Sequence, residues 1–233
     1  ALLYEMKIAA DGAVWSATSR GVYKYAGGQF TAFLTVPANT SPPCWDFDFA
    51  PNGKLFCSHT LPFFFDPATQ QTQTVISSAL AYSQSSVLTI DDHHFVFSGD
   101  HGDVALITDS TETDTFEIGS LALDMQTQNG HLFLLDEATK NLYQRTGSTL
   151  TTVDMQAGNG ELEAFLTDAA GNIWGGANYN GGNLYIMDNS ANVQQIDLHH
   201  NNIDDNLVRG IRPGSNGYLL LLESTGIQRL NPS

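Results

Sequence analysis

The sequence predicts an all-β protein, a six-bladed β-propeller built from four-stranded repeats of about 40 residues. A five-residue unit recurs, made of a small or turn residue, Gly, any residue, an apolar residue and an aromatic or large apolar residue. Its copies end at Trp15, Phe56, Phe97, Phe133, Trp174 and Leu220, so the steps are 41, 41, 36, 41 and 46 residues. Short β-branched and aromatic runs bounded by Gly, Asn and Asp follow each copy, and no stretch keeps a helical period. A five-bladed ring, or part of a seven-bladed one, is the structural alternative.

Each repeat shows the same series of elements. A near-alternating strand comes first, as at residues 45–49, and the glycine turn with a second strand follows, as at 52–56. A third apolar strand and a polar fourth strand complete most repeats, as at 183–186 and 192–196. The copy at 93–97 keeps the apolar pair without the glycine, and the last repeat ends without a fourth strand. Within one domain over 1–233, the expected blades span approximately 3–36, 44–77, 86–118, 121–155, 162–198 and 207–233.

The chain is strongly acidic, with 9 Lys and Arg against 25 Asp and Glu and a formal net charge of −16. Such a field repels polyanions, because phosphate contacts need Lys and Arg, and nucleic acid is therefore excluded as a partner. Hydrophobic residues make up 42% and charged residues 15%, which is enough apolar material for a buried core. No apolar run approaches the roughly 20 residues that a membrane-spanning helix needs, so no membrane span is expected.

Cys44 and Cys57 are the two cysteines, and they lack the spacing of a structural zinc site. They flank residues 50–53, which are typical of a tight turn between two strands, so they are candidates for a disulfide across a hairpin. A pair of buried free thiols is the alternative. A bridge would indicate an oxidising compartment.

One repeat continues in a distinctive way. The sixth repeat begins with Asn206-Leu207-Val208-Arg209-Gly210-Ile211 and continues through residues 216–219 and 224–230. Repeat one follows the same pattern over residues 11–23. This series resembles the two-component regulator propeller repeat, which occurs in the periplasmic sensor halves of bacterial hybrid histidine kinases. The resemblance implies a periplasmic or secreted sensor domain. The same Asp-Gly-x-Leu-Trp pattern occurs in streptogramin lyases, lactonase-type propellers and NHL repeats. The pattern therefore predicts the fold of this chain but not its activity.

Two groups of polar residues are expected on opposite faces of the blades. In a propeller, the loops from strand four to the next strand one and from strand two to strand three share one face, here termed the loop face. Residues of the turns between first and second strands, here termed the turn face, include Asp11, Asn52, Asp91, Asp92, His93, His94, Asn129 and Asn216. The candidate ligand-binding residues, on the loop face or lining the channel, are Trp45, Asp46, His59, His101, Asp136, Glu163, Asn178, Tyr179, His199 and Arg209.

A metal site is a further possibility on the loop face. Asp100-His101-Gly102-Asp103 places two carboxylates and an imidazole within four residues, which could wrap a cation such as Ca²⁺. Asp204 is the candidate ligand from another blade. A solvated acidic turn is the alternative interpretation.

Three functions compete. The first is a non-catalytic, extracytoplasmic ligand-binding or sensor propeller for a small molecule or glycan. The second is a metal-dependent lyase or lactonase, in which Glu163, Asn178, Asn202 and Asp204 would hold a divalent cation. The third is a scaffold for a protein partner. The sequence contains no nucleophile elbow, zinc-protease motif or phosphate loop, and this favours a protein that is not an enzyme without deciding the matter.

Overall fold

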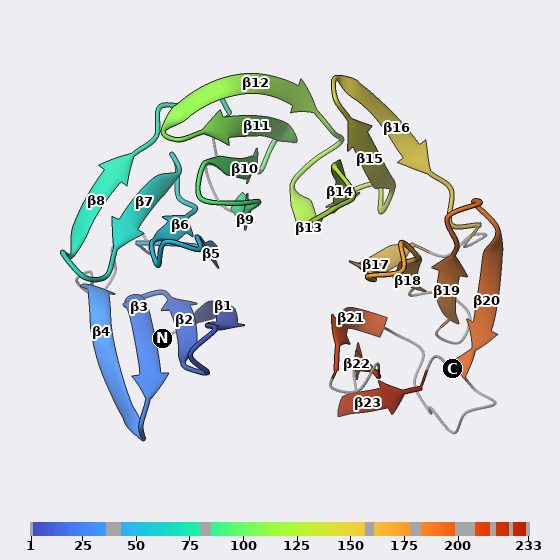
Figure 1. Ribbon diagram of the computed structural model, residues 1–233, viewed down its shortest axis with the longest axis horizontal. Helices are drawn as coiled ribbons and strands as arrows, with labels where there is room; N and C mark the ends of the chain where they lie inside the picture. Colours follow the sequence, from blue (N-terminus) through green and yellow to red (C-terminus); the bar gives the residue numbers. More distant parts are fainter. Residues whose placement is uncertain are drawn as a thin grey trace. The chain divides into compact units, whose positions relative to one another are not determined.

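The computed structural model describes residues 2–35, 43–79, 85–156, 161–177, 183–198, 208–214, 218–223 and 226–231. Within these ranges, six antiparallel sheets follow one another in sequence, five with four strands and the last with three (Figure 1). Each sheet is an up-and-down meander with its strands in sequence order, as expected of a propeller blade. The all-β prediction and the six-bladed β-propeller fold class are thus confirmed. No helix within the described ranges has the length and apolar character needed to cross a membrane.

The chain divides into two compact units, Ala1–Ala122 and Leu123–Ser233. Unit 1 contains three sheets, and the fourth strand of each sheet, β4, β8 or β12, forms one of its edges (Figure 1). Its strands are β1 (Leu3–Ile8), β2 (Val14–Thr18), β3 (Gly21–Ala26), β4 (Gln29–Thr35), β5 (Phe47–Phe49), β6 (Leu55–Cys57), β7 (Phe63–Asp66), β8 (Gln71–Thr74), β9 (Ser85–Thr89), β10 (His94–Gly99), β11 (Asp103–Thr108) and β12 (Thr111–Glu117).

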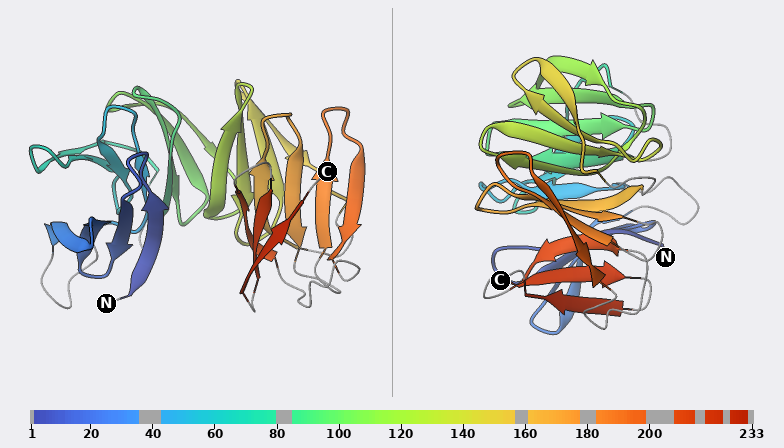
Figure 2. Two further views of the ribbon diagram at one scale, coloured as in Figure 1. Left: turned by 60° about the horizontal axis from the view of Figure 1, so that its bottom comes forward. Right: turned by 90° about the vertical axis from the view of Figure 1, so that its right-hand side faces the viewer.

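Unit 2 contains the remaining three sheets, and Figure 2 shows tight hairpins between β15 and β16 and between β19 and β20. Its strands are β13 (Ala122–Gln128), β14 (His131–Asp136), β15 (Leu142–Thr146), β16 (Thr149–Val153), β17 (Leu162–Thr167), β18 (Ile173–Ala177), β19 (Asn183–Met187), β20 (Val193–Asp197), β21 (Val208–Pro213), β22 (Leu219–Glu223) and β23 (Gly226–Leu230). A single domain over 1–233 stays a prediction from the repeats.

The recurring glycine closes the turn between the first and second strands of a blade. In the second blade, the backbone N–H of Gly53 donates to Ala50 O, and that of Ala50 donates to Lys54 O, both at 2.9 Å. Gly53 has φ +84°, a left-handed conformation that Gly adopts without steric cost. The repeat therefore needs glycine at this point for backbone reasons.

The third blade makes the equivalent turn without glycine. Asp91 Oδ1 accepts the backbone N–H groups of His93 at 2.7 Å and His94 at 2.8 Å, so its side chain organises the turn instead. These bonds stabilise the carboxylate. The N–H of His93 and then the imidazole of His94 lower the pKa of Asp91 to about 2.

In the second blade, the apolar pair of the repeat packs on both faces of its sheet. Leu55 belongs to the core between the first two sheets, together with Trp15 and Phe65, whereas the next residue, Phe56, belongs to the core between the second and third sheets. Successive residues of a strand point to opposite faces. A second strand that is covered on both sides by neighbouring blades therefore needs two consecutive apolar residues, and the repeat supplies them.

Candidate functional site

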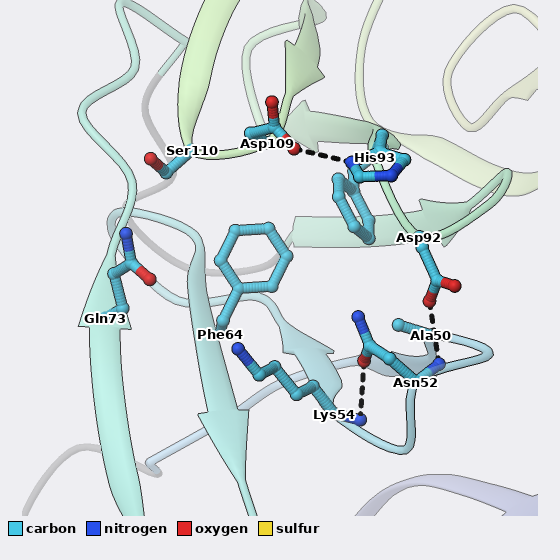
Figure 3. Close-up of a pocket in the computed structure, with 10 residues that line it drawn as sticks. Ala50, Asn52, Lys54, Phe64, Gln73, Asp92, His93, Asp109 and Ser110 are labelled. Carbon is cyan, nitrogen blue, oxygen red and sulfur yellow. Dashed lines mark hydrogen bonds and ion pairs between the residues drawn. The ribbon is translucent and has the colours of Figure 1, made fainter.

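A groove opens in unit 1 between the second sheet, β5–β8, and the third sheet, β9–β12. It has a cavity volume of about 380 Å³. It lies on the turn face, because the turns β5–β6, β9–β10 and β11–β12 contribute to it. We call it the polar groove. Its lining residues are Ala50, Asn52, Lys54, Phe64, Gln73, Asp92, His93, Phe95, Asp109 and Ser110 (Figure 3).

Two turns from successive blades are tied together on one side of the polar groove. Asp92 Oδ1 accepts the backbone N–H of Asn52 at 2.7 Å, although the two residues are 40 positions apart. Asn52 Oδ1 in turn accepts the backbone N–H of Lys54 at 3.1 Å. The Asn52 and Lys54 side chains are thus attached to a turn that is itself held in place by the neighbouring blade (Figure 3).

A histidine and a carboxylate form another part of the rim. His93 Nδ1 lies 2.7 Å from Asp109 Oδ1, and the two side chains are 68% and 70% exposed. The hydrogen bond to Asp109 and the attraction of its charge raise the pKa of His93 above 6.5. Because both groups are exposed, this pair adds little stability, and its atoms are accessible to a ligand.

The floor of the polar groove is aromatic. Phe64 and Phe95 meet edge to face, with ring centroids 4.7 Å apart and an interplanar angle of 68°. Both are buried in the core between the two sheets, and Phe56 packs against each of them. Carboxylates, amides, an ammonium and an imidazole therefore surround an apolar floor. This arrangement can accept and donate several hydrogen bonds to a small polar molecule.

The sequence placed its ligand-binding candidates on the loop face or in the channel, and none of those that the structure describes lines the polar groove. Trp45 and His59 do come together, because their rings stack at 4.8 Å with an interplanar angle of 17°. Trp45 is partly buried against the core of the second and third blades. These two residues form a small aromatic patch on the loop face of unit 1.

Asp46 acts as a connector between blades. Its Oδ2 accepts the backbone N–H of Val87 at 2.9 Å, and its Oδ1 accepts that of Phe47 at 2.7 Å. Lys7 Nζ lies 3.6 Å from Asp46 Oδ1 and 3.4 Å from Asp48 Oδ1. Burial raises the pKa of Asp46 despite the attraction of Lys7, while the attraction of the two carboxylates outweighs burial and raises the pKa of Lys7.

Unit 2 holds three of the other candidates. Asp136 is buried, and its Oδ1 accepts the backbone N–H of Thr139 at 2.6 Å, so it caps the β14–β15 turn. Glu163 on β17 forms an ion pair of 3.2 Å with Lys140. Arg209 on β21 is exposed.

The remaining ligand-binding and metal candidates are distributed as follows. His101 is exposed, with its Nε2 3.8 Å from Asp100 Oδ1. Asp103 begins β11 on the same turn. No group of three or more His, Cys, Asp or Glu side chains able to hold a metal occurs in the part of the chain that the structure describes. Asn178, Tyr179, His199, Asn202 and Asp204 lie outside the described residues.

The two cysteines are neighbours in the core. Both are free, buried thiols, and the Cys44 Sγ–H donates to the backbone carbonyl of Asp46 at 2.8 Å. Burial, followed by the hydrogen bond with the Cys57 thiol, raises the pKa of Cys44 well above its usual value. The sequence was compatible with either a disulfide bridge or two free thiols, and the structure contains two free thiols.

The sequence assigned Asn52, Asp92 and His93 to the turn face but did not identify them as a site. One feature of the sequence could have identified them. Asp92 and His93 follow Asn52 by about one repeat, so consecutive blades place these polar residues in adjacent turns. No local pattern connected them with Gln73, Asp109 or Phe64, which come from other strands and turns.

No protein-family model and no curated protein matches the sequence. Solved structures do match its fold. The extracellular domain of the provisionally assigned hybrid two-component system BT3049 from B. thetaiotaomicron has a TM-score of 0.72 and 13% identity, over 99% of this chain and 34% of that one. The extracellular domain of the provisionally assigned one-component system BT4673, from the same organism, has a TM-score of 0.64 and 12% identity, over 98% and 38%.

A further similar structure is BBS1N, solved in complex with ARL6DN. It has a TM-score of 0.70 and 12% identity, over 99% of this chain and 78% of that one. The chain spans little more than a third of the two bacterial domains. At these identities the likeness is one of fold. The neighbours nevertheless include the extracellular domain of a hybrid two-component system, the class in which the repeat that this sequence resembles is found.

Proposed function

We propose that this chain is a non-catalytic, sensor-type propeller that binds a small polyhydroxylated ligand, such as a glycan, in the polar groove. The observation that carries the proposal is the groove itself. Its volume of about 380 Å³ is in the range of small-molecule pockets, which run from roughly 300 to 1,000 Å³.

The chemistry of the lining suits hydroxyl groups. Asp92, Asp109 and Asn52 offer oxygen acceptors, while Lys54, Gln73 and His93 offer donors. A sugar needs both kinds of partner, because each of its hydroxyl groups donates and accepts. The aromatic floor formed by Phe64 and Phe95 supplies an apolar surface for the carbon skeleton.

Fold likeness and charge support the same proposal. The similar bacterial structures are extracellular domains of two-component or one-component systems, so we propose a periplasmic or secreted location. A net charge of −16 disfavours anionic ligands and leaves neutral or cationic ones. Protein partners and further domains of a longer receptor are compatible with this role.

The test is titration calorimetry of the purified protein with a panel of neutral mono- and disaccharides. We expect at least one sugar to bind, and Ser110→Trp to abolish that binding because the indole would fill the polar groove. Ser148→Trp is the matched control, since Ser148 occupies the equivalent two-residue turn between β15 and β16 and is exposed.

Two results would contradict the proposal. The first is the absence of binding across the whole panel. The second is binding that Ser110→Trp leaves unchanged, which would place the ligand elsewhere on the chain. Circular dichroism and thermal melts of both variants establish that they are folded before they are compared.

A further inference from the structure

A second pocket lies in unit 1 on the same face, between the first sheet, β1–β4, and the second, β5–β8. Its cavity volume is about 520 Å³, and we call it the apolar pocket. It is distinct from the polar groove, although Ala50 lines both. Its lining residues are Ala9, Ala10, Asp11, Trp15, Lys24, Phe49, Ala50, Pro51, Gly53, Leu55 and Pro67.

The wall of the apolar pocket is aromatic at its centre. Trp15 is 5% exposed and stacks on Phe33, with ring centroids 4.9 Å apart and an interplanar angle of 29°. Phe49 meets Trp15 edge to face at 6.1 Å. Leu55, two prolines and three alanines complete the lining, so most of the surface offers no hydrogen bond. Such a cavity favours an apolar group of the size of a large side chain.

Among its lining residues, the apolar pocket has charges only at Asp11 and Lys24. Lys24 Nζ lies 2.9 Å from Asp11 Oδ2 and 5.4 Å from the centroid of the Trp15 ring. Asp11 Oδ1 accepts the backbone N–H of Ala13 at 3.0 Å, which fixes the carboxylate at the edge of the pocket. One anion and one cation therefore stand side by side next to an apolar cavity.

We infer that the apolar pocket binds a free α-amino acid with a large apolar side chain. The ligand ammonium would pair with Asp11, its carboxylate would pair with Lys24, and its side chain would enter the cavity beside Trp15. Adjacent charges of opposite sign match the two charges of a zwitterion, which are attached to one carbon atom. A ligand with a single charge would leave either Asp11 or Lys24 without a new partner.

The existing ion pair does not prevent this binding. The side chains of Asp11 and Lys24 are 59% and 27% exposed, and an exposed pair is worth about 0–1 kcal/mol. A zwitterion that inserts between them restores both charge interactions, so opening the pair costs little. The inference does not rest on the proposed function, because the polar groove and the apolar pocket have different charged residues.

The experiment is titration calorimetry with L-phenylalanine and three analogues that differ in charge. N-acetyl-L-phenylalanine amide lacks both charges, 3-phenylpropionate keeps the carboxylate, and phenethylamine keeps the ammonium. We expect L-phenylalanine to bind at least about tenfold more tightly than each analogue. Equal affinity for L-phenylalanine and its neutral amide would overturn the inference, and so would the absence of binding by L-phenylalanine.

Two variants locate the binding. Lys24→Met keeps the aliphatic stem and removes the cation, and Asp11→Asn keeps the oxygen that accepts the Ala13 N–H. Each should weaken L-phenylalanine binding about tenfold or more, whereas Lys54→Met, which alters the polar groove only, should leave it unchanged. L-phenylalanine binding that survives both Lys24→Met and Asp11→Asn would overturn the assignment to this pocket.

Discussion

Asp46 Oδ2 accepts the backbone N–H of Val87 at 2.9 Å, and the two residues are 41 positions apart. That separation equals the main repeat step of the sequence. The same separation recurs between Asp48 and Thr89 and, in unit 2, between Gln126 and Thr167. A side chain on the first strand of one blade, or directly before it in the case of Asp46, thus holds the backbone of the first strand of the next.

This linkage predicts the effect of removing Asp46. Asp46→Ala should lower the free energy of unfolding by about 2–4 kcal/mol, because two backbone N–H groups lose a charged acceptor. Asp46→Asn keeps one acceptor oxygen and should cost less. Urea unfolding at pH 7 measures both variants. An alanine variant as stable as the wild type would show that the contact adds nothing.

Gly176 and Gly175 provide a matched pair for testing how closely two blades approach in unit 2. A Cβ at Gly176 would lie 2.6 Å from Val208 Cγ1 and 2.7 Å from Val208 Cβ, whereas one at Gly175 would meet Leu162 Cδ2 at 2.9 Å. Val208 is buried and branched at Cβ, but the tip of Leu162 can rotate away. We expect Gly176→Ala to destabilise by about 1–3 kcal/mol and Gly175→Ala by clearly less. Denaturant midpoints compare them, and equal effects would contradict the packing argument.

The thiol pair predicts a response to oxidation. Cys44 and Cys57 are buried neighbours with a raised pKa at Cys44, so the folded thiols should react slowly, whereas oxidative refolding, which exposes both, should bridge them. A bridge closing a loop of about 15 residues stabilises by roughly 3 kcal/mol. Mass spectrometry with and without reductant detects the bridge, and thermal melts measure its effect. Cys44→Ser should abolish the reductant dependence, and two thiols that stay free after oxidative refolding would contradict the prediction.

His93 and Asp109 predict a pH-dependent charge at the polar groove. The pKa of His93 is raised above 6.5 by Asp109, so the small stabilisation from this exposed pair is fully present below about pH 6.5 and is lost as the pH rises through the folded-state pKa. An NMR titration of the imidazole should show this elevated pKa. In Asp109→Asn the value should fall toward 6.5, and an unchanged value would show that another group raises it.

Asp168 predicts an effect of the opposite sign at acid pH. Burial would raise its pKa, but hydrogen bonds from Trp174 Nε1 and Asn172 outweigh burial and lower it below 3.8. The stability that it contributes is therefore present above about pH 3.8 and is lost as the pH falls through the folded-state pKa.

Asp168→Asn should cost about 1–3 kcal/mol at pH 7, and this difference should shrink toward pH 3. Urea unfolding at both values tests it. Trp174→Phe is the complementary control, because it removes one donor and keeps the aromatic packing. A cost that does not change with pH would assign the effect to packing rather than to charge.

The repeat pattern predicted the fold class because it encodes contacts within and between blades that every copy must make. Gly53 was recognisable because its turn needs a left-handed backbone, and Leu55 with Phe56 because the second strand is covered on both faces. Such requirements are local and periodic. They appear in the sequence whether or not a blade has any function.

The tertiary structure alone decided the chemistry of individual polar residues. Asp46 and Asp136 look like ligand groups in the sequence, yet they accept backbone hydrogen bonds from Val87 and Thr139. The polar groove and the apolar pocket combine side chains from different strands and from two sheets, and no sequence period connects Asp109 with Asn52 or Trp15 with Pro67. A binding site depends on which side chains meet across neighbouring blades, and packing in three dimensions determines that meeting.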